Sequence, residues 1–208
     1  MEKFIRFTAT ACPLDRANID TDQLLPARFL KVQRSAGFDQ LLFHDQRFDA
    51  TGKEKGDFPL NQARWRDARI LVGARNFGGG SSREAAVYAL YDYGIRCVIA
   101  PSFGDIFAQN AAKNGVLAAV VTEKIAAELR EALRGEGAAP VTVDLESQSI
   151  VHGGRTYPFT VDPTRRLRLL NGWDDLDITN SYRQAIAEFK ACDAVRRPWA
   201  TLQQNVGD

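Results

Sequence analysis

The chain has 208 residues, 45% of them hydrophobic, and its 27 Lys and Arg nearly balance its 26 Asp and Glu. A chain of this size buries a sufficient core as one domain, and a nucleic-acid or anionic-membrane binder usually carries a basic excess that is missing here. No stretch approaches the roughly 18 apolar residues of a membrane-spanning helix, and the first residues lack the apolar core of a signal peptide. We therefore expect a soluble, cytoplasmic protein that binds neither nucleic acid nor membrane.

The cysteines and histidines give no pattern typical of a metal site. Cys12, Cys97 and Cys192 lie far apart, and an odd number without a CxxC pair argues against a secreted disulfide framework. Cys97 lies in an apolar run, which favours a small buried hydrophobic residue. The two histidines, His44 and His152, are expected at the surface, so we predict no metal site in this chain.

The first third of the chain mixes a strand with irregular segments. We expect a strand over 4–11 that ends at Pro13, and a structured loop over 16–30. We expect a short helix within 34–48. Residues 50–66 are expected to form a polar surface loop in which Trp65 packs inward.

Residues 68–134 alternate between apolar runs and amphipathic segments. The runs at 68–74, 97–100 and 116–121 predict buried strands. Helices are expected over 82–93, over 101–115 and after Thr122, which has the side chain of an N-cap. Strands that alternate with helices in this way favour a parallel α/β layer.

The last third has a different character. Residues 141–147 and 149–161 read as antiparallel strands with a turn at 152–155, and helices are expected over 163–171 and over 180–192, the latter capped by Asn180. The tail from 196 is polar. We predict one α/β domain over 1–208, with a core of parallel strands and additional antiparallel strands.

The segment RNFGGGSSREAAVYAL, residues 75–90, joins a predicted buried strand to a predicted helix. Glycines allow a sharp turn and a close approach of the backbone to a ligand, and the unpaired N–H groups of a helix start attract an anion. Arg83 adds a bidentate grip on a carboxylate. The segment therefore predicts a cradle for a small acid or a phosphate.

Other interpretations of the same segment are weaker or purely structural. Walker A fails because Gly79 stands where lysine is needed, and the G-x-S-x-G nucleophile elbow fails because Ser82 is followed by Arg83. A capping box formed by Ser81 and Glu84, with the glycines making a tight turn, remains an alternative. It leaves the arginine and the run of three glycines unexplained.

A second segment, NIDTDQLLP at 18–26, is rich in acidic residues. It fails as an EF-hand loop because Leu25 stands where that loop needs glycine. An Asx-type turn ahead of Pro26 is its structural alternative.

Several ordered blocks carry a family resemblance. The residues NFGGGSSRE at 76–84, the loop at 18–26, and the blocks IAPSFGDIF, NAAKNGVL and LLNGWDDLDIT resemble those of the small subunit of 3-isopropylmalate dehydratase, in the aconitase superfamily. The resemblance covers nearly the whole chain. It implies a single swivelling β/β/α domain that docks on a large subunit, and the large subunit carries a [4Fe–4S] cluster, with no cofactor in this chain.

The implied reaction is a hydro-lyase isomerisation in leucine biosynthesis. 2-Isopropylmalate loses water, and the alkene takes it back with hydroxyl and hydrogen exchanged. By the resemblance, Ser81 is the catalytic base, acting as an alkoxide, and the substrate is bound by Arg83, Ser82 and Gly80. Helix N–H groups, the glycine turn and the guanidinium would stabilise the alkoxide.

The resemblance also implies substrate-binding roles for Asp22 and for Arg34, although Arg34 has a plain surface charge as its alternative. The chain departs from the family pattern after SSRE, where it has Ala85 and Tyr88 instead of the usual histidine and tryptophan. A related hydro-lyase for citraconate or methylmalate, dimethylmaleate or homoaconitate therefore stays an alternative. So does a non-catalytic anion-binding paralogue.

Overall fold

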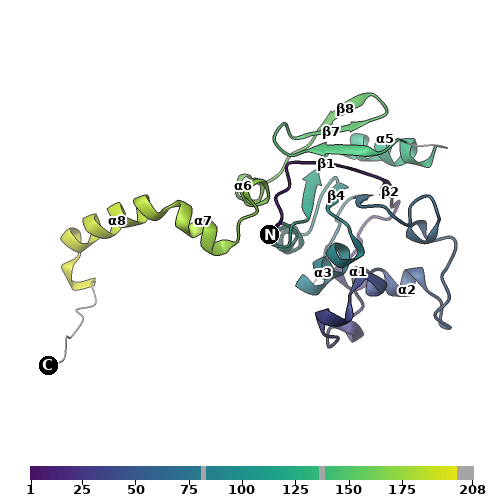
Figure 1. Ribbon diagram of the computed structural model, residues 1–208, viewed down its shortest axis with the longest axis horizontal. Helices are drawn as coiled ribbons and strands as arrows, with labels where there is room; N and C mark the ends of the chain where they lie inside the picture. Colours follow the sequence, from purple (N-terminus) through teal and green to yellow (C-terminus); the bar gives the residue numbers. More distant parts are fainter. Residues whose placement is uncertain (81–82, 136–138, 201–208) are drawn as a thin grey trace. The chain divides into compact units, whose positions relative to one another are not determined.

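The computed structural model describes residues 1–80, 83–135 and 139–200. The chain divides into two compact units, Met1–Gly172 and Trp173–Asp208. The larger unit contains both sheets and the predicted site residues, and the described part of the smaller one consists of two α-helices and a short 3-10 helix at Pro198–Ala200 (Figure 1). That 1–208 acts as one functional domain stays a prediction.

Two four-stranded sheets form the larger unit. One is antiparallel, in the order β1-β6-β7-β8, and the other is parallel, in the order β2-β3-β4-β5. The antiparallel sheet comprises β1 (Arg6–Ala9), β6 (Val141–Asp144), β7 (Ser149–His152) and β8 (Arg155–Pro158). The parallel sheet comprises β2 (Ala11–Pro13), β3 (Ile70–Val72), β4 (Cys97–Ala100) and β5 (Leu117–Val120). The predicted fold class is confirmed, with parallel core strands and additional antiparallel ones.

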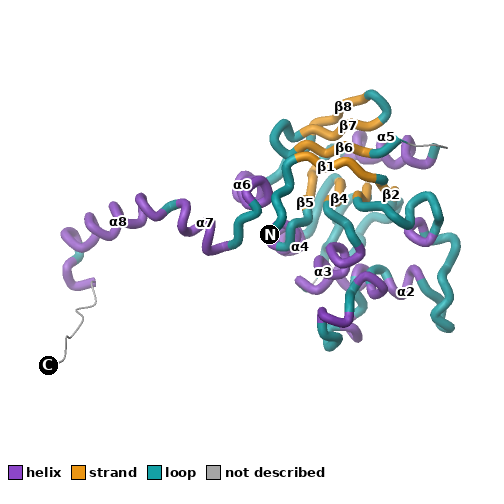
Figure 2. Tube along the Cα trace, in the orientation of Figure 1, coloured by secondary structure: helices purple, strands orange, loops and turns teal. Residues whose placement is uncertain are grey.

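The parallel sheet is buried on both faces. Successive side chains of a strand point to opposite faces, so Ile70 and Val72 pack into one core while Leu71 packs into the other. One core lies between this sheet, the antiparallel sheet and α5; the other lies against α3 and the segment 14–65. Figure 2 shows this order, with β6–β8 on one side of β4 and β5 and with α2 and α3 on the other. Burial on both faces explains why these strands are short, continuous apolar runs.

The helices connect and cover the sheets. The α-helices of the larger unit are α1 (Thr21–Leu24), α2 (His44–Arg47), α3 (Glu84–Tyr93), α4 (Asp105–Lys113), α5 (Glu123–Arg134) and α6 (Pro163–Asn171). Short 3-10 helices lie at Ala27–Phe29, Arg34–Ala36, Asp39–Leu41 and Pro59–Asn61. Thr122 caps α5 by accepting from the backbone N–H of Ile125, as predicted, and Trp65 is buried. None of the helices within the described ranges has the length and apolar character needed to cross a membrane.

Three predictions of local structure are wrong. The expected single strand over 4–11 is β1 followed by β2, because the chain leaves one sheet and enters the other at Thr10. The expected helix within 34–48 is two 3-10 turns and the four-residue α2. The helix expected over 180–192 is α7 (Asp175–Ser181) followed by α8 (Arg183–Arg196), so Asn180 lies inside α7, which Asp174 caps instead.

Candidate functional site

The glycine-rich segment lies at the carboxyl edge of the parallel sheet. It follows β3 directly, and Phe77 pairs with Phe103 in the loop that follows β4. Open α/β sheets bind their ligands at this edge. Two of the predicted site residues, Ser81 and Ser82, lie outside the described residues, so the site is built from what surrounds them.

The two segments singled out in the sequence lie against each other. The backbone N–H of Asn18 donates to the carbonyl of Arg75 at 2.9 Å, that of Gly78 to Ile19 at 2.6 Å, and that of Thr21 to Gly79 at 3.1 Å. The Asn76 side chain also donates to that of Asn18 at 3.0 Å. Residues 18–22 and 75–79 therefore form one joined surface, which we call the paired loops.

The glycines serve the packing of the paired loops. Gly78 has φ = 70°, and a Cβ added there would lie 2.1 Å from the ring of Phe107. Gly80, with φ = 90°, is exposed, and a Cβ added there would be in ordinary van der Waals contact with the Cβ of Asp20 at 3.4 Å. Gly78 is thus needed for internal packing, whereas Gly80 is exposed, and its contact with a ligand stays a prediction.

The start of α3 excludes the capping-box alternative. The helix begins at Glu84, with Arg83 as the N-cap residue in an extended conformation and without a side-chain capping hydrogen bond. A capping box needs its acidic residue three positions after the N-cap, whereas Glu84 follows the N-cap directly and accepts from the amide of Asn114 at 3.0 Å. Ser81 lies two residues before the N-cap, and the helix expected from residue 82 begins two residues later.

Arg83 and Asp22 form an ion pair across the paired loops. Nη1 of Arg83 donates to Oδ1 of Asp22, and the same oxygen accepts from the backbone N–H of Ala27 at 2.8 Å. The hydrogen bond from Arg83, and after it that from Ala27, lowers the pKa of Asp22. The Arg83 side chain is 22% exposed and that of Asp22 58%, so the guanidinium is held beside an open surface. Asp22 thus stabilises the turn that precedes Ala27 and also fixes the position of the Arg83 guanidinium.

Arg34, in the 3-10 helix Arg34–Ala36, packs against α3. In the described parts of the chain it forms no ion pair with Asp22 and no hydrogen bond with Arg83. Its guanidinium carbon lies 4.0 Å from the centre of the Tyr88 ring, and its Nη2 lies 3.3 Å from Oδ1 of Asp92. The ring of Phe38 stacks on the ring of Tyr88, with 6.4 Å between ring centres. The structure therefore joins Arg34 to α3, the helix whose N-cap is Arg83.

Sequence reasoning missed Tyr88 and Asp92 as partners of Arg34. Tyr88 stood out only as a departure from a family pattern, and Asp92 carried no signal. The left-handed backbone of Asn18 and of Asn76, both with φ = 57°, was also missed. Asparagine tolerates this conformation better than most residues, so two asparagines at the paired loops were a signal that could have been used.

The cysteines do not form a cluster site in the described residues. Cys12 and Cys97 are buried, and burial raises the pKa of both thiols well above its usual value, whereas Cys192 is exposed. The prediction that Cys97 is a buried hydrophobic residue is confirmed. Over residues 1–80, 83–135 and 139–200, no three His, Cys, Asp or Glu side chains are grouped so that they could hold a metal ion.

One histidine prediction is wrong. His152 is 6% exposed rather than at the surface, because it lies at the end of β7 on the face turned to the core. His44 is partly exposed and packs between the rings of Phe29 and Phe48, with ring centres 4.8 Å and 5.2 Å away.

Comparisons with known proteins agree with this architecture. A family model described as the aconitase C-terminal domain matches residues 1–124, and a second, described as LeuD_N, matches 127–163. The 3-isopropylmalate dehydratase small subunit of Rhodospirillum centenum is 48% identical over 96% of this chain and 99% of its own length, and that of Gluconobacter oxydans is 49% identical over 91% and 92%.

A solved structure shows the same fold. The crystal structure of a 3-isopropylmalate dehydratase from Methanocaldococcus jannaschii superposes with a TM-score of 0.60 at 23% identity, covering 89% of this chain and 99% of that one. The match shows the fold, and the near full-length relatives confirm the resemblance first seen in the glycine-rich segment. The chain belongs to the family of 3-isopropylmalate dehydratase small subunits and contains the aconitase C-terminal domain.

Proposed function

We propose that this chain is the small subunit of a 3-isopropylmalate dehydratase, a hydro-lyase that isomerises 2-isopropylmalate to 3-isopropylmalate in leucine biosynthesis. The observation that carries the proposal is the meeting of the paired loops, which sets Asp22 and Arg83 together at the start of α3. The relatives that match nearly the whole chain are named as small subunits of that enzyme.

The substrate is a dicarboxylic acid, and Arg83 is the group best placed to bind one of its carboxylates. Asp22 accepts from Nη1 of its guanidinium, and within the described residues the remaining N–H groups have no other side-chain partner and could bind a carboxylate. A second cation, Arg34, is held at α3 by Tyr88 and Asp92. Two carboxylates of one substrate would thus meet two arginines whose positions are both set by this helix.

Proton removal falls to Ser81 in this proposal. In the sequence, Ser81 directly follows the exposed Gly80 and precedes Arg83, the N-cap of α3, by two positions. A serine becomes a base only where its anion is stabilised. The guanidinium and the amide groups at the start of α3 supply such stabilisation.

Loss of hydroxide is assigned to the partner. An iron–sulfur cluster, when bound, supplies a Lewis acid for the departing hydroxyl group. The described residues of this chain offer no ligand set for it, since Cys12 and Cys97 are buried apart from any group of acidic or histidine side chains. We therefore assign the [4Fe–4S] cluster to the large subunit, with which this chain would share one active site.

The test is reconstitution with the large subunit under anaerobic conditions. We expect Ser81→Ala to lower turnover of 2-isopropylmalate by about 10²- to 10⁴-fold, the range for loss of a general base. Arg83→Lys should chiefly raise KM, because a point charge does not reproduce a bidentate grip. Ser149→Ala and Arg155→Lys, on the antiparallel sheet, are the matched controls.

Three outcomes would contradict the proposal. Full activity of Ser81→Ala would show that Ser81 is not the base. An unchanged KM in Arg83→Lys would show that Arg83 does not bind a substrate carboxylate. Faster turnover of methylmalate or homoaconitate than of isopropylmalate would keep the reaction class and change the substrate.

A further inference from the structure

A second, positively charged cavity lies at the opposite end of the parallel sheet. It has a volume of about 190 Å³, and its lining includes Arg69 and Arg96. Arg69 directly precedes β3 and Arg96 directly precedes β4, so the cavity lies at the amino edge of the sheet. The paired loops follow β3 at the carboxyl edge. The cavity is therefore separate from the candidate active site.

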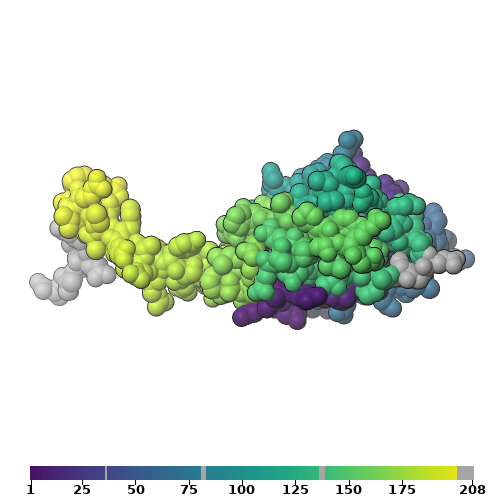
Figure 3. All heavy atoms as spheres, turned by 90° about the horizontal axis from the view of Figure 1, so that it is seen from above, coloured from purple at the N-terminus to yellow at the C-terminus, as the bar shows by residue number. Residues whose placement is uncertain are grey.

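The outer wall of this cavity is fixed by the fold. It is formed by residues 2–7, which Figure 3 shows in dark purple along the surface of the larger unit. The backbone N–H of Phe4 donates to the carbonyl of Leu169 on α6 at 2.9 Å, and the carbonyl of Ile5 accepts from Leu145 at 2.8 Å. These backbone hydrogen bonds hold the wall against the rest of the larger unit, so side chains placed on it need little ordering when a ligand binds.

The charge of the cavity is almost entirely of one sign. Its lining contains Lys3, Arg6, Arg69 and Arg96 and a single carboxylate, that of Glu2. Across the described ranges, none of these four cations forms an ion pair; Asp144 lies opposite Arg6 in the β1–β6 ladder but does not line the cavity. Four cations against one anion leave an excess positive charge around a space open to solvent.

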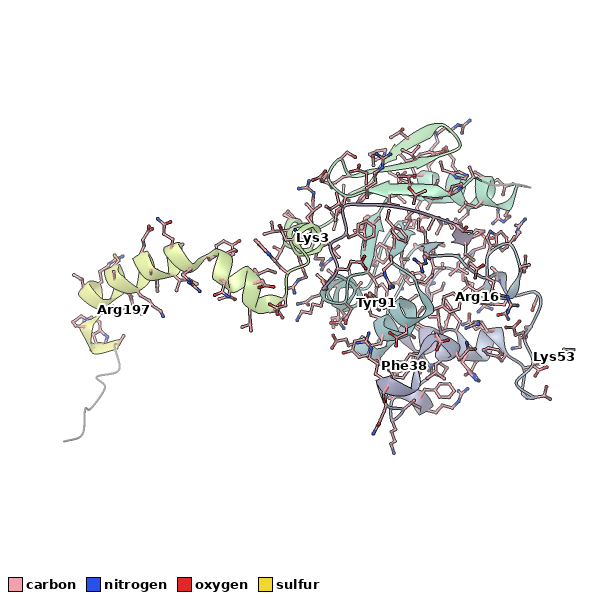
Figure 4. The ribbon with its side chains drawn as sticks, in the orientation of Figure 1. Lys3, Arg16, Phe38, Lys53, Tyr91 and Arg197 are labelled. Atoms are coloured by element: carbon pink, nitrogen blue, oxygen red, sulfur yellow. The ribbon has the colours of Figure 1, made fainter. Side chains whose placement is uncertain are left out.

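Arg96 is the most constrained of these cations. It is half-buried, its guanidinium carbon lies 3.6 Å from the centre of the Tyr91 ring, and its Nη1 donates to the carbonyls of Tyr91 at 2.8 Å and Ile95 at 3.1 Å. The carbonyl of Tyr91 belongs to the last turn of α3, whose negative end offsets part of the charge. A partly buried cation usually also has an anionic partner, and across the described ranges the other N–H groups of Arg96 form no ion pair that would take this place. Lys3 and Tyr91 are both labelled in Figure 4.

We propose that this cavity binds a small anion with two or more negative charges, held through phosphate or carboxylate oxygens. Guanidinium groups recognise both through paired hydrogen bonds, and the excess of cations favours a multivalent anion over chloride. The aromatic rings of Phe4, Phe7 and Tyr91 line the same space and would pack against a carbon skeleton. The inference does not depend on the proposed activity.

The test is calorimetric titration of the whole chain, without its partner, with inorganic phosphate and separately with citrate. We expect saturable binding of at least one of them with a Kd below about 10 mM, weakening as salt rises because the contacts are electrostatic. Arg69→Gln removes an exposed cation that forms no ion pair within the described ranges, so the fold should persist while binding weakens about tenfold. Binding of phosphate alone would identify a phosphate-bearing ligand, and binding of citrate alone an organic acid.

Two control variants locate the binding. Arg155→Gln removes an exposed arginine of β8 outside the cavity and should leave the Kd unchanged. Arg83→Gln removes the cation of the candidate active site and should also leave it unchanged. Absence of saturable binding, equal weakening in Arg155→Gln and Arg69→Gln, or loss of binding only in Arg83→Gln would each overturn the proposal.

Discussion

Removal of the Tyr88 ring tests how Arg34 is held on α3. The ring supports a guanidinium at 4.0 Å and stacks with Phe38 at 6.4 Å. A cation–π contact of a partly exposed arginine contributes about 0.5–1 kcal/mol, and an aromatic pair about 0.5–1.5 kcal/mol. Tyr88→Ala should therefore lower the free energy of unfolding by about 1–2.5 kcal/mol. Tyr88→Phe keeps the ring and should lower it by less than about 0.5 kcal/mol.

A double-mutant cycle isolates the contact between the two side chains. Urea unfolding of Arg34→Ala, Tyr88→Ala and the double variant should give a coupling energy of about 0.5–1 kcal/mol. The matched control pairs Arg34→Ala with Tyr91→Ala, because Tyr91 contacts Arg96 instead; that cycle should be additive within about 0.3–0.5 kcal/mol. In the reconstituted enzyme the same coupling corresponds to a KM raised about two- to fivefold in Tyr88→Ala.

The two cycles are expected to differ in their coupling energies. A coupling energy for Arg34 and Tyr88 no larger than that of the control would show that the ring does not hold the guanidinium. A normal coupling energy together with an unchanged KM would keep the structural contact and remove Arg34 from substrate binding.

Two further predictions concern the paired loops. Gly78→Ala should lower the free energy of unfolding by about 2–5 kcal/mol in denaturant titration, because a Cβ meets a phenylalanine ring of α4 at a positive φ, whereas Gly56→Ala, in open space, should change it by less than about 0.5 kcal/mol. The lowered pKa of Asp22 means that its ion pair with Arg83 stabilises the fold above the carboxyl's ordinary pKa and that this contribution disappears as pH falls through the lowered value. Asp22→Asn breaks this largely exposed ion pair, so the variant should be about 0.2–1 kcal/mol less stable than the wild type at neutral pH and equally stable in acid. A constant difference in the free energy of unfolding at all pH values would show that the ion pair does not contribute in this way.

The parallel layer was predictable because its signal is local. Each of β3, β4 and β5 is a short apolar run followed by a helix, and burial on both faces requires such runs. The change from one sheet to the other at Thr10 was not predictable, because it depends on β1 pairing with β6, which lies more than 130 residues further along the chain. Pro13 also looked like an end of structure. It is tolerated in β2 because that strand lies at the edge of its sheet.

The helix boundaries near residue 180 show a signal that was present and not used. Asp174 and Asp177 form a capping box at the start of α7, a pattern spaced three residues apart and visible in the sequence. Asn180 is also a residue typical of N-caps, but it lacks an acidic residue three positions later. The reciprocal hydrogen bonds of the capping box satisfy two backbone donors at once, which a lone asparagine does not.

For the site, the sequence supplied the residue types and the structure supplied their pairing. The glycine-rich segment and the arginine were visible as a cradle for an anion, and Asp22 entered only through the family resemblance. Its contact with Arg83 spans 61 positions in the chain. The contact arises from backbone hydrogen bonds between the paired loops, and no side-chain pattern encodes those.

The ion pair also accounts for an arginine at the start of a helix, where a cation opposes the helix dipole. Asp22 lies in the first turn of α1, the favourable place for an acid, and it offers its carboxylate to Arg83 at the N-cap of α3. The acid of one helix start thus neutralises the cation of the other. Because Asp22 takes only the Nη1 edge, Arg83 is fixed in place while its other donors remain unclaimed by Asp22. A carboxylate that binds there enters a site already oriented for it, which reduces the ordering cost of binding.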